Sequence, residues 1–153
     1  MTKILMVCLG NICRSPLAEG ILKSKVNVTE VLVDSAGTGG YHVGSLPDSR
    51  SISVAQKHGI DISNQRCRKF ALDDFKIFDT IFVMDKSNYN NIIALAETNE
   101  NRKKVKLLLE EVEIGISEVP DPYYGGANGF EYVFELIEQA CNQIAQKLEN
   151  GRR

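Results

Sequence analysis

The sequence predicts a single α/β domain in which helices cover both faces of a parallel sheet. Short β-favouring apolar runs alternate along the chain with segments that carry helix-start signals or helical periodicity. The 153 residues suit one compact domain that buries its own core. No repeat, low-complexity tract or linker divides them. We therefore expect residues 1–153 to form one domain.

The first predicted strand leads into a loop and then into a helix. Residues 3–7 form an apolar, β-favouring run typical of a buried strand, and residues 8–14 are predicted as a loop. Ser15 and Pro16 then predict a helix start, with serine as the N-cap and proline at the first helical position. Glu19 suits the first turn of that helix, where negative charge is favoured.

The rest of the chain continues this alternation. In order, we expect a strand at 31–33, a glycine-rich loop at 37–44, a helix at 47–58, a strand at 79–84, a helix at 87–96, a strand at 105–109, a loop at 120–129 and a last helix. Residues 105–109 are almost as compatible with a helix. Apolar residues from Phe130 to Leu148 recur at three- and four-residue steps, which predicts the last helix. Ligands of open parallel sheets bind at the carboxyl ends of strands, so the loop after the first strand is the expected site.

Composition and charge exclude several classes of protein. The formal net charge of −2 predicts no broad basic surface, so we expect no nucleic-acid or membrane partner. The apolar run at residues 4–9 is too short for a signal peptide or a membrane span, and we expect a cytoplasmic protein with reduced thiols. The cysteines, Cys8, Cys13, Cys67 and Cys141, include no CxxC pair and predict no metal site. Cys67 and Cys141 are expected to be inert.

The loop after the first strand has the properties of an anion-binding loop. Cys8 and Arg14 flank five residues, and the loop runs into a predicted helix N-terminus, where backbone N–H groups and the helix dipole favour phosphate. Gly10 permits unusual backbone angles, and Asn11 tolerates the left-handed region. The residues expected to bind the phosphate are Leu9, Gly10, Asn11, Ile12, Cys13 and Ser15.

The same loop predicts nucleophilic chemistry. Its positive field stabilises a thiolate at Cys8, and Ser15 could donate a hydrogen bond to that sulfur. Arg14 offers a planar fork that matches two phosphate oxygens, which lysine would not supply. We therefore expect Cys8 to attack a phosphoryl group that Arg14 binds.

A second segment is predicted to supply the acid for such a reaction. Asp121 lies in a proline-containing loop beside Tyr123 and Tyr124. Partial burial against those rings would keep a proton on the carboxyl group, which could then protonate a leaving group. The two tyrosines could also form the walls of a slot for a flat ring.

Together these segments resemble the low-molecular-weight protein tyrosine phosphatase family. The signature is Val-Cys-Leu-Gly-Asn-Ile-Cys-Arg-Ser-Pro at residues 7–16, followed by Ala-Glu, and Asp-Pro-Tyr-Tyr at residues 121–124. Residues 34–38 and 78–85 are also family-like, so the resemblance covers nearly the whole chain. It implies the phosphotyrosine phosphatase I-like fold, with four parallel strands and flanking helices.

The resemblance also implies a mechanism and a substrate. Cys8 would form a cysteinyl-phosphate, Arg14 would bind the transferred group, and Asp121 would act as general acid and then as general base. The substrate would be phosphotyrosine in a protein or peptide, or a small aryl phosphate, and phosphate would be released without a metal or other cofactor. We expect a monomer or a weak dimer.

Further residues are assigned by the same resemblance. Asn11, Ser15 and Ser35 would hold the loop in shape, Asp85 would orient the arginine, and Tyr41, Tyr123 and Tyr124 would surround the entrance. Gln65 stands near a position that is often histidine in this family and is linked to the hydrogen-bond network of the loop. Because glutamine can still form hydrogen bonds, we expect this network to be tuned differently rather than lost. Tyr41 stands where some members carry tryptophan, which leaves peptide preference open. A second loop cysteine can pair with the nucleophile in this family, so we hypothesise a reversible Cys8–Cys13 disulfide under peroxide.

Other interpretations remain open from the sequence alone. Cys8 could be a buried structural thiol, Asp121 a turn former, Asp85 a helix cap and Ser35 the end of a strand. His42 and His58 are given no role. An arsenate reductase would need a further pair of closely spaced cysteines, an arginine phosphatase tends to carry threonine in place of Ile12, and a phosphopeptide-binding module would need neither the thiolate nor the acid.

Overall fold

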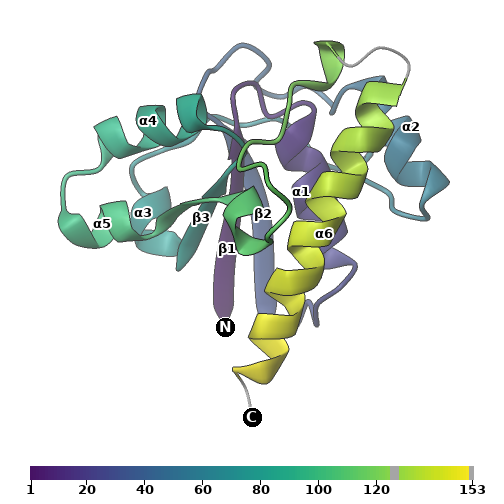
Figure 1. Cartoon of the computed structure of the whole chain (residues 1–153). Coiled ribbons are helices and arrows are strands. Elements are labelled where there is room, and N and C mark those ends of the chain that lie inside the picture. The colour runs from purple at the N-terminus through teal and green to yellow at the C-terminus, as the bar shows by residue number, and fades with distance from the viewer. Residues whose placement is uncertain (125–127, 152–153) are drawn as a thin grey trace.

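Four parallel strands form the centre of the computed structural model, which describes residues 1–124 and 128–151, with Tyr124 described through its backbone. The strands are β1 (Thr2–Cys8), β2 (Val31–Gly37), β3 (Thr80–Val83) and β4 (Val105–Leu107). Their order in the sheet is β2-β1-β3-β4, and Figure 1 shows β1 between β2 and β3. The predicted parallel α/β class is therefore confirmed.

Helices lie on both faces of this sheet (Figure 1). The α-helices are α1 (Arg14–Lys23), α2 (Ser49–Lys57), α3 (Asp74–Ile77), α4 (Lys86–Leu95), α5 (Asn99–Lys103) and α6 (Gly129–Asn150). The 3-10 turns are η1 (Leu108–Glu111) and η2 (Pro122–Tyr124). Helices α1, α2 and α6 gather on one face, and α3, α4 and α5 lie on the other.

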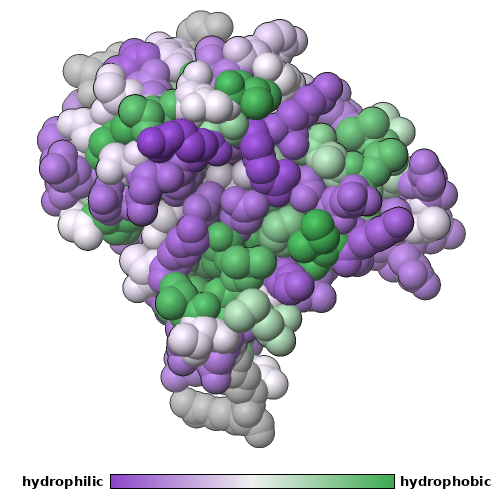
Figure 2. Space-filling view, turned by 180° about the vertical axis from the view of Figure 1, so that it is seen from behind, coloured by the Kyte–Doolittle hydropathy of each residue, from purple (hydrophilic) through white to green (hydrophobic). Residues whose placement is uncertain are grey.

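The alternation of side chains along β1 divides the core into two layers. Ile4 and Met6 pack in the cluster that contains the apolar faces of α1 and α6, whereas Leu5 and Val7 pack in the cluster that contains residues of α3 and α4. All four side chains are buried because β1 is central and covered on both faces. Seen from behind, the surface shows apolar residues in separate patches among hydrophilic ones (Figure 2).

The strand order places the expected loop at a switch point. β1 connects through α1 to β2 on one side, and the chain then crosses to β3 on the other side of β1. The loops that follow β1 and β3 therefore diverge at the carboxyl edge of the sheet, where open α/β folds bind ligands. No helix in the described part of the chain is long and apolar enough to cross a bilayer.

The start of α1 differs from the prediction. Cys13 is the N-cap, without a side-chain capping bond, and Arg14 is the first helical residue, so Ser15 and Pro16 occupy the second and third positions. The hydroxyl of Ser15 instead lies 3.0 Å from the sulfur of Cys8. Proline is tolerated in the first turn because the N–H groups there have no helical partner.

Several other boundaries also differ. Residues 105–109, for which strand and helix were both compatible, divide into β4 and the 3-10 turn η1. The short helices α3 and α5 were not predicted, and η2 interrupts the loop predicted at 120–129. The helix predicted at 47–58 is confirmed as α2, which begins after its N-cap Asp48 and ends before Gly59, whose φ of 78° only glycine adopts readily.

Candidate active site

The end of β2 holds the loop between β1 and α1 from outside. The N–H of Thr38 donates to the carbonyl of Cys8 (2.9 Å), and the N–H of Gly39 donates to the carbonyl of Leu9 (2.9 Å). Gly37 makes this approach possible, because a Cβ there would lie 2.8 Å from the carbonyl oxygen of Leu9 and 3.1 Å from the nitrogen of Asn11. Gly37 was predicted only as the start of a loop. It instead ends β2 and determines how closely the loop between β1 and α1 approaches that strand.

Substitution of Gly37 by alanine is expected to displace the loop backbone. Because misplacement of about 1 Å can cost roughly a hundredfold in rate, we expect kcat/KM to fall about tenfold to hundredfold. Gly40→Ala is the matched control, since its Cβ would meet the side chain of Lys69 at 3.5 Å, an ordinary contact. Steady-state kinetics and thermal melts check both variants, and wild-type activity in folded Gly37→Ala would contradict this account of the loop.

A second segment of chain holds the other side of the loop. The N–H of Asp48 donates to the carbonyl of Ile12 (2.7 Å), and the thiol of Cys67 donates to the carbonyl of Asn11 (2.8 Å). Asn11 has a φ of 56°, which confirms the predicted left-handed conformation. Because these carbonyls turn outward, the intervening N–H groups turn toward the inside of the loop and the N-terminus of α1, as in an anion-binding nest.

The side chain of Asn11 connects the loop to β2. Its Nδ2 donates to the hydroxyl oxygens of Ser15 (2.8 Å) and Ser35 (3.0 Å). The backbone N–H of Arg68 donates to its Oδ1 (3.0 Å), which determines which end of the amide faces the serines. Arg68 was not predicted. Its guanidinium pairs with Asp34 and Asp74, so a long-range contact with no sequence motif sets its position.

These bonds define a direction for the hydroxyl protons. Ser35 donates to the carboxylate of Glu19 (2.7 Å) and accepts from Asn11, and Ser15 also accepts from Asn11. The proton of Ser15 is therefore free to donate to the sulfur of Cys8 at 3.0 Å, which favours a thiolate there.

Glu19 anchors this chain from inside the protein. It lies in the second turn, since α1 begins at Arg14 and its first turn holds no acidic residue, which corrects the expected first-turn position. Glu19 is buried, and burial raises the pKa of its carboxyl group despite the hydrogen bond from Lys23 (2.5 Å). Its contribution to the loop was missed, because the sequence shows that it lies in the helix but not that it reaches Ser35.

Arg14 is fixed by two contacts from distant segments. Its Nη1 donates to Asp85 Oδ2 (2.7 Å) and to the carbonyl of Val119 (2.9 Å). Asp85 Oδ1 also accepts from the N–H of Asn88, so this residue caps α4 and holds the arginine at once. Both contacts use Nη1, and the Nε–Nη2 edge can therefore present two parallel donors to a phosphate.

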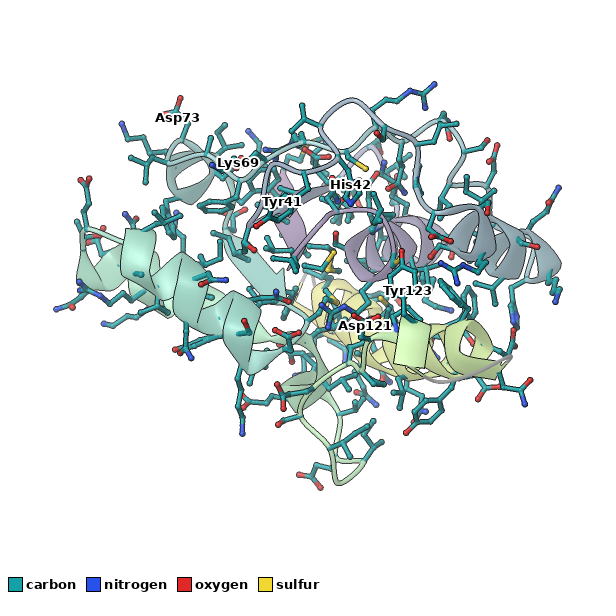
Figure 3. All side chains as sticks on the ribbon, turned by 90° about the horizontal axis from the view of Figure 1, so that it is seen from above. Tyr41, His42, Lys69, Asp73, Asp121 and Tyr123 are labelled. Carbon is teal, nitrogen blue, oxygen red and sulfur yellow. The ribbon has the colours of Figure 1, made fainter. Side chains whose placement is uncertain are left out.

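A cavity of about 180 Å³ lies above the loop. Its lining residues come from three segments that are far apart in sequence: Cys8, Leu9, Gly10, Ile12, Cys13, Arg14, Tyr41, His42, Asp121, Pro122 and Tyr123. Tyr41 and His42 lie on one side of the site, and Asp121 and Tyr123 lie on the opposite side (Figure 3). The fold thus brings together the predicted nucleophile, phosphate binder and acid. His42, which was given no role, and Pro122, which was not predicted as a site residue, are the unpredicted members of this lining.

The carboxylate of Asp121 is exposed, which corrects the prediction that aromatic rings partly bury it. Among the residues that the structure describes, it is held by the N–H of Tyr123 alone (2.9 Å). Tyr41 is 77% exposed and stands at the rim. The side chain of Tyr124 lies outside the described residues, so its predicted place at the entrance stays a prediction.

Gln65 lies beside α1 and not in the cavity. Its Nε2 donates to the carbonyl of Pro16 (3.0 Å), and its Oε1 is buried without a partner among the described residues. Gln65 therefore contacts the helix that carries Glu19 rather than the loop itself.

The remaining cysteines are buried thiols in this structure. Burial raises the pKa of Cys13 to about 11, and burial also raises the pKa values of Cys67 and Cys141. Cys67 is not merely inert packing, because its S–H supports the carbonyl of Asn11. Cys141 lies on the apolar face of α6 and packs in the core, as its place in the apolar stripe predicted.

Comparison with known proteins identifies the family. The model of the low molecular weight phosphotyrosine protein phosphatase family matches residues 3–153. The chain belongs to this family. The low molecular weight phosphotyrosine protein phosphatase of Schizosaccharomyces pombe is 45% identical over 152 residues, which cover 93% of this chain and 96% of the yeast protein.

Solved structures of the low-molecular-weight phosphatases support the same conclusion. A protein tyrosine phosphatase from Entamoeba histolytica has a TM-score of 0.90 and 38% identity, with 100% of both chains covered. An arginine phosphatase from Drosophila has a TM-score of 0.84 and 34% identity, with 96% of this chain and 98% of that chain covered. The chain is therefore an enzyme of the protein tyrosine phosphatase class, a group of cysteine-based hydrolases, and one neighbour on this fold is named for a different phosphorylated residue.

Proposed function

We propose that this enzyme hydrolyses phosphotyrosine in proteins and peptides, and small aryl phosphates, through a cysteinyl-phosphate intermediate. The observation that carries the proposal is that one cavity is lined by the thiol of Cys8, the guanidinium of Arg14 and the carboxyl group of Asp121. A thiolate, a bidentate phosphate binder and an acid are the groups that such a reaction needs, and none of them requires a metal.

The first half of the reaction transfers the phosphoryl group to sulfur. The thiolate of Cys8 attacks phosphorus, the bond to the phenolic oxygen breaks, and its electron pair leaves with that oxygen. Asp121 donates the proton that the leaving oxygen needs. The inward N–H groups and the Nε–Nη2 edge of Arg14 stabilise the charge on the three remaining phosphate oxygens.

The second half returns the enzyme to its starting state. Asp121, now ionised, accepts a proton from water while the water oxygen attacks phosphorus. The sulfur–phosphorus bond breaks, its electrons return to Cys8 as thiolate, and inorganic phosphate leaves. The hydroxyl of Ser15, 3.0 Å from the sulfur, stabilises the departing thiolate in this step.

The rim of the cavity supports an aromatic substrate. Tyr41 and Tyr123 border the cavity from opposite sides, so they can contact both faces of a ring that enters between them. The apolar side chain of Ile12 lines the cavity as well, which favours an aryl phosphate over phosphoarginine. We also infer that the enzyme works in the cytoplasm, where the thiol of Cys8 stays reduced.

A panel of substrates tests this assignment. Phosphate release is measured from matched phosphotyrosine, phosphoserine and phosphoarginine peptides by freshly reduced enzyme in the presence of a chelator. We expect turnover of phosphotyrosine to exceed the other two by at least about a hundredfold, because hydrogen-bond and shape mismatches discriminate on this scale. Faster release from phosphoarginine would assign the enzyme to the chemistry named for the Drosophila neighbour, and dependence on added metal would refute the thiol mechanism.

The acid role of Asp121 predicts a dependence on the leaving group. Asp121→Asn is expected to lower kcat about 10²- to 10⁴-fold for phenyl phosphate, whose leaving oxygen needs a proton, and much less for p-nitrophenyl phosphate. Asp73→Asn is the matched control, since Asp73 carries the same charge on the surface and lies away from Asp121 (Figure 3). Equal losses with both substrates would remove Asp121 from the acid role.

Peroxide is expected to join Cys8 and Cys13. Because the pKa of Cys13 is raised to about 11, this thiol stays protonated at neutral pH, and the first oxidation falls on Cys8. Peroxide converts the Cys8 thiolate to a sulfenic acid, and Cys13 then displaces water from that sulfur to form the disulfide. Mass spectrometry of peptides at pH 7 checks the product, with Cys13→Ser as the control that cannot pair. Sulfinic acid at Cys8 beside free Cys13 would refute the disulfide.

A further inference from the structure

Asp48 joins three parts of the active site. Its backbone N–H donates to the carbonyl of Ile12 in the phosphate loop (2.7 Å), and its Oδ1 accepts from the N–H of Arg50 as the N-cap of α2 (2.8 Å). Its Oδ2 accepts from the hydroxyl of Tyr123, which belongs to the segment that carries Asp121 (2.9 Å). One residue therefore contacts the loop that binds phosphate and the loop that supplies the acid.

Arg50 holds that carboxylate in place. Its Nε and Nη2 donate to the two oxygens of Asp48 (3.1 and 3.0 Å), and these bonds lower the pKa of Asp48. The guanidinium also lies over the rings of Tyr123 and Phe130, 4.6 and 4.8 Å from their centroids. The two rings meet edge to face with centroids 6.0 Å apart. Asp48 thus holds Tyr123 by its hydroxyl, and the guanidinium of Arg50 holds it by the face of its ring.

The phosphate loop adds a further contact to the same tyrosine. The thiol of Cys13 donates to the hydroxyl oxygen of Tyr123 (3.3 Å), which in turn donates to Asp48. Burial and these two contacts raise the pKa of Tyr123, so its hydroxyl remains a donor at neutral pH. The ring of Tyr123 therefore bridges the phosphate loop and the N-terminus of α2.

Asp121 depends on this arrangement for its position. Its carboxylate is exposed, and within the described part of the chain the N–H of Tyr123 is its hydrogen-bond partner. We propose that Asp48 and Arg50 are positioning residues that lock Tyr123 against the phosphate loop and so hold Asp121 ready to protonate the leaving group before substrate arrives. This inference rests on the proposed function, because it gives a geometric cause for the acid role.

The lock accounts for how an exposed acid can be effective. A general acid must lie within hydrogen-bond reach of the leaving oxygen, and an unconstrained surface carboxylate would populate that position only part of the time. The lock supplies the constraint through Tyr123, while Asp48 and Arg50 themselves do not line the cavity. Loss of the lock should therefore slow proton donation and leave phosphate binding unchanged.

Two variants remove the lock and keep the fold. Asp48→Ser retains an N-cap bond from the backbone N–H of Arg50, because serine caps helices as well as aspartate, but it is too short to reach the hydroxyl of Tyr123 or the guanidinium of Arg50. Tyr123→Phe retains the ring that lies beneath the guanidinium of Arg50 and removes only the hydroxyl. Asp61→Ser is the matched control, since Asp61 is an exposed aspartate that accepts from the N–H of Ser63 in a turn remote from Tyr123 (2.8 Å).

The experiment compares kcat with phenyl phosphate and p-nitrophenyl phosphate, alone and combined with Asp121→Asn, and measures inorganic phosphate affinity by calorimetry. We expect Asp48→Ser and Tyr123→Phe each to lower kcat about tenfold for phenyl phosphate, less for p-nitrophenyl phosphate, and hardly at all once Asp121 is asparagine, because residues acting through one group are not additive. Phosphate affinity should stay within twofold of the wild type.

The results that would overturn the lock can be distinguished from one another. Equal losses with both substrates, or the same loss in the Asp121→Asn background, would show that Asp48 acts on the fold or on phosphate binding and not through the acid. Absence of any loss would show that Tyr123 needs no lock. If Asp121→Asn itself shows no leaving-group dependence, the acid role in the proposed function fails, and the lock fails with it.

Discussion

Cys8→Ser is expected to abolish turnover while the protein continues to bind phosphate. A serine hydroxyl is hardly ionised at neutral pH, and the group that the described part of the chain places beside it, 3.0 Å from the Cys8 sulfur, is the hydroxyl of Ser15, which is not a base. Removal of a covalent nucleophile costs roughly 10⁴-fold or more. The measurement is release of phosphate from a phosphotyrosine peptide. Because the expected loss is so large, wild-type contamination of the variant must stay below about one part in 10⁵.

Phosphate binding separates this effect from a folding defect. The loop amides and the guanidinium of Arg14 bind phosphate without help from the sulfur. The affinity for inorganic phosphate, measured by calorimetry, should therefore change by less than about tenfold, which corresponds to about 1.4 kcal/mol of binding free energy. Cys67→Ser is the matched control, because it makes the same substitution beside the loop and keeps a donor for the carbonyl of Asn11. Turnover within tenfold of wild type in Cys8→Ser would place the nucleophile elsewhere.

The parts of the fold that could be predicted are those that depend on local residue patterns. Three elements depend on residues near one another in sequence: the apolar run of β1, the helix predicted at 47–58 that forms α2, and the three- and four-residue steps of α6. Ser15 shows the limit of such reasoning. A serine before proline is a good helix start in isolation, but tertiary contacts with Asn11 and Cys8 use its hydroxyl instead, and the helix begins earlier.

The site divides in the same way. Cys8, Arg14 and Asp121 lie in recognisable segments, and the fold places all three around one cavity. The groups that hold them could not be found by pattern, because they act across the fold. Arg68 reaches the loop through its backbone, and Glu19 reaches it through Ser35. A helical glutamate or a half-buried arginine has no local signal of such a contact. The packing of β2 against α1 creates the first, and the bond from the N–H of Gly37 to the carbonyl of Arg68 places the second.

The lock around Tyr123 shows how local sequence patterns and long-range contacts combine. The sequence placed Tyr123 beside Asp121 as a wall for the substrate ring, and the structure adds that its hydroxyl lies 2.9 Å from Asp48. Asp48 was predicted as part of a helix start and has that place, and its second carboxylate oxygen, which the cap does not use, accepts from Nη2 of Arg50 and from the hydroxyl of Tyr123. One short side chain therefore serves both local structure and the site.

Arg14→Lys is expected to reduce kcat/KM about 10³- to 10⁵-fold, the range that an arginine contributes to phosphoryl transfer. Lysine keeps the positive charge but presents a point charge in place of two parallel N–H donors. It also cannot donate to Asp85 and Val119 while facing the phosphate, since the arginine does so through Nη1 and keeps its other edge for substrate. The affinity for inorganic phosphate should fall far less than kcat, because the geometric match matters most in the transition state.

Asp85→Asn isolates the orientation of the arginine from its charge. Asparagine keeps the oxygen that caps α4 through the N–H of Asn88 and removes the ion pair with Arg14, which the carbonyl of Val119 still holds. We expect a loss in kcat/KM of about tenfold to hundredfold, as for a misoriented catalytic group, with little change in melting temperature. If Arg14→Lys kept wild-type activity, the bidentate fork would be irrelevant and charge alone would explain the role of this residue. If Asp85→Asn instead unfolded the protein at lower temperature while the remaining folded enzyme kept full activity, Asp85 would serve only as the cap of α4.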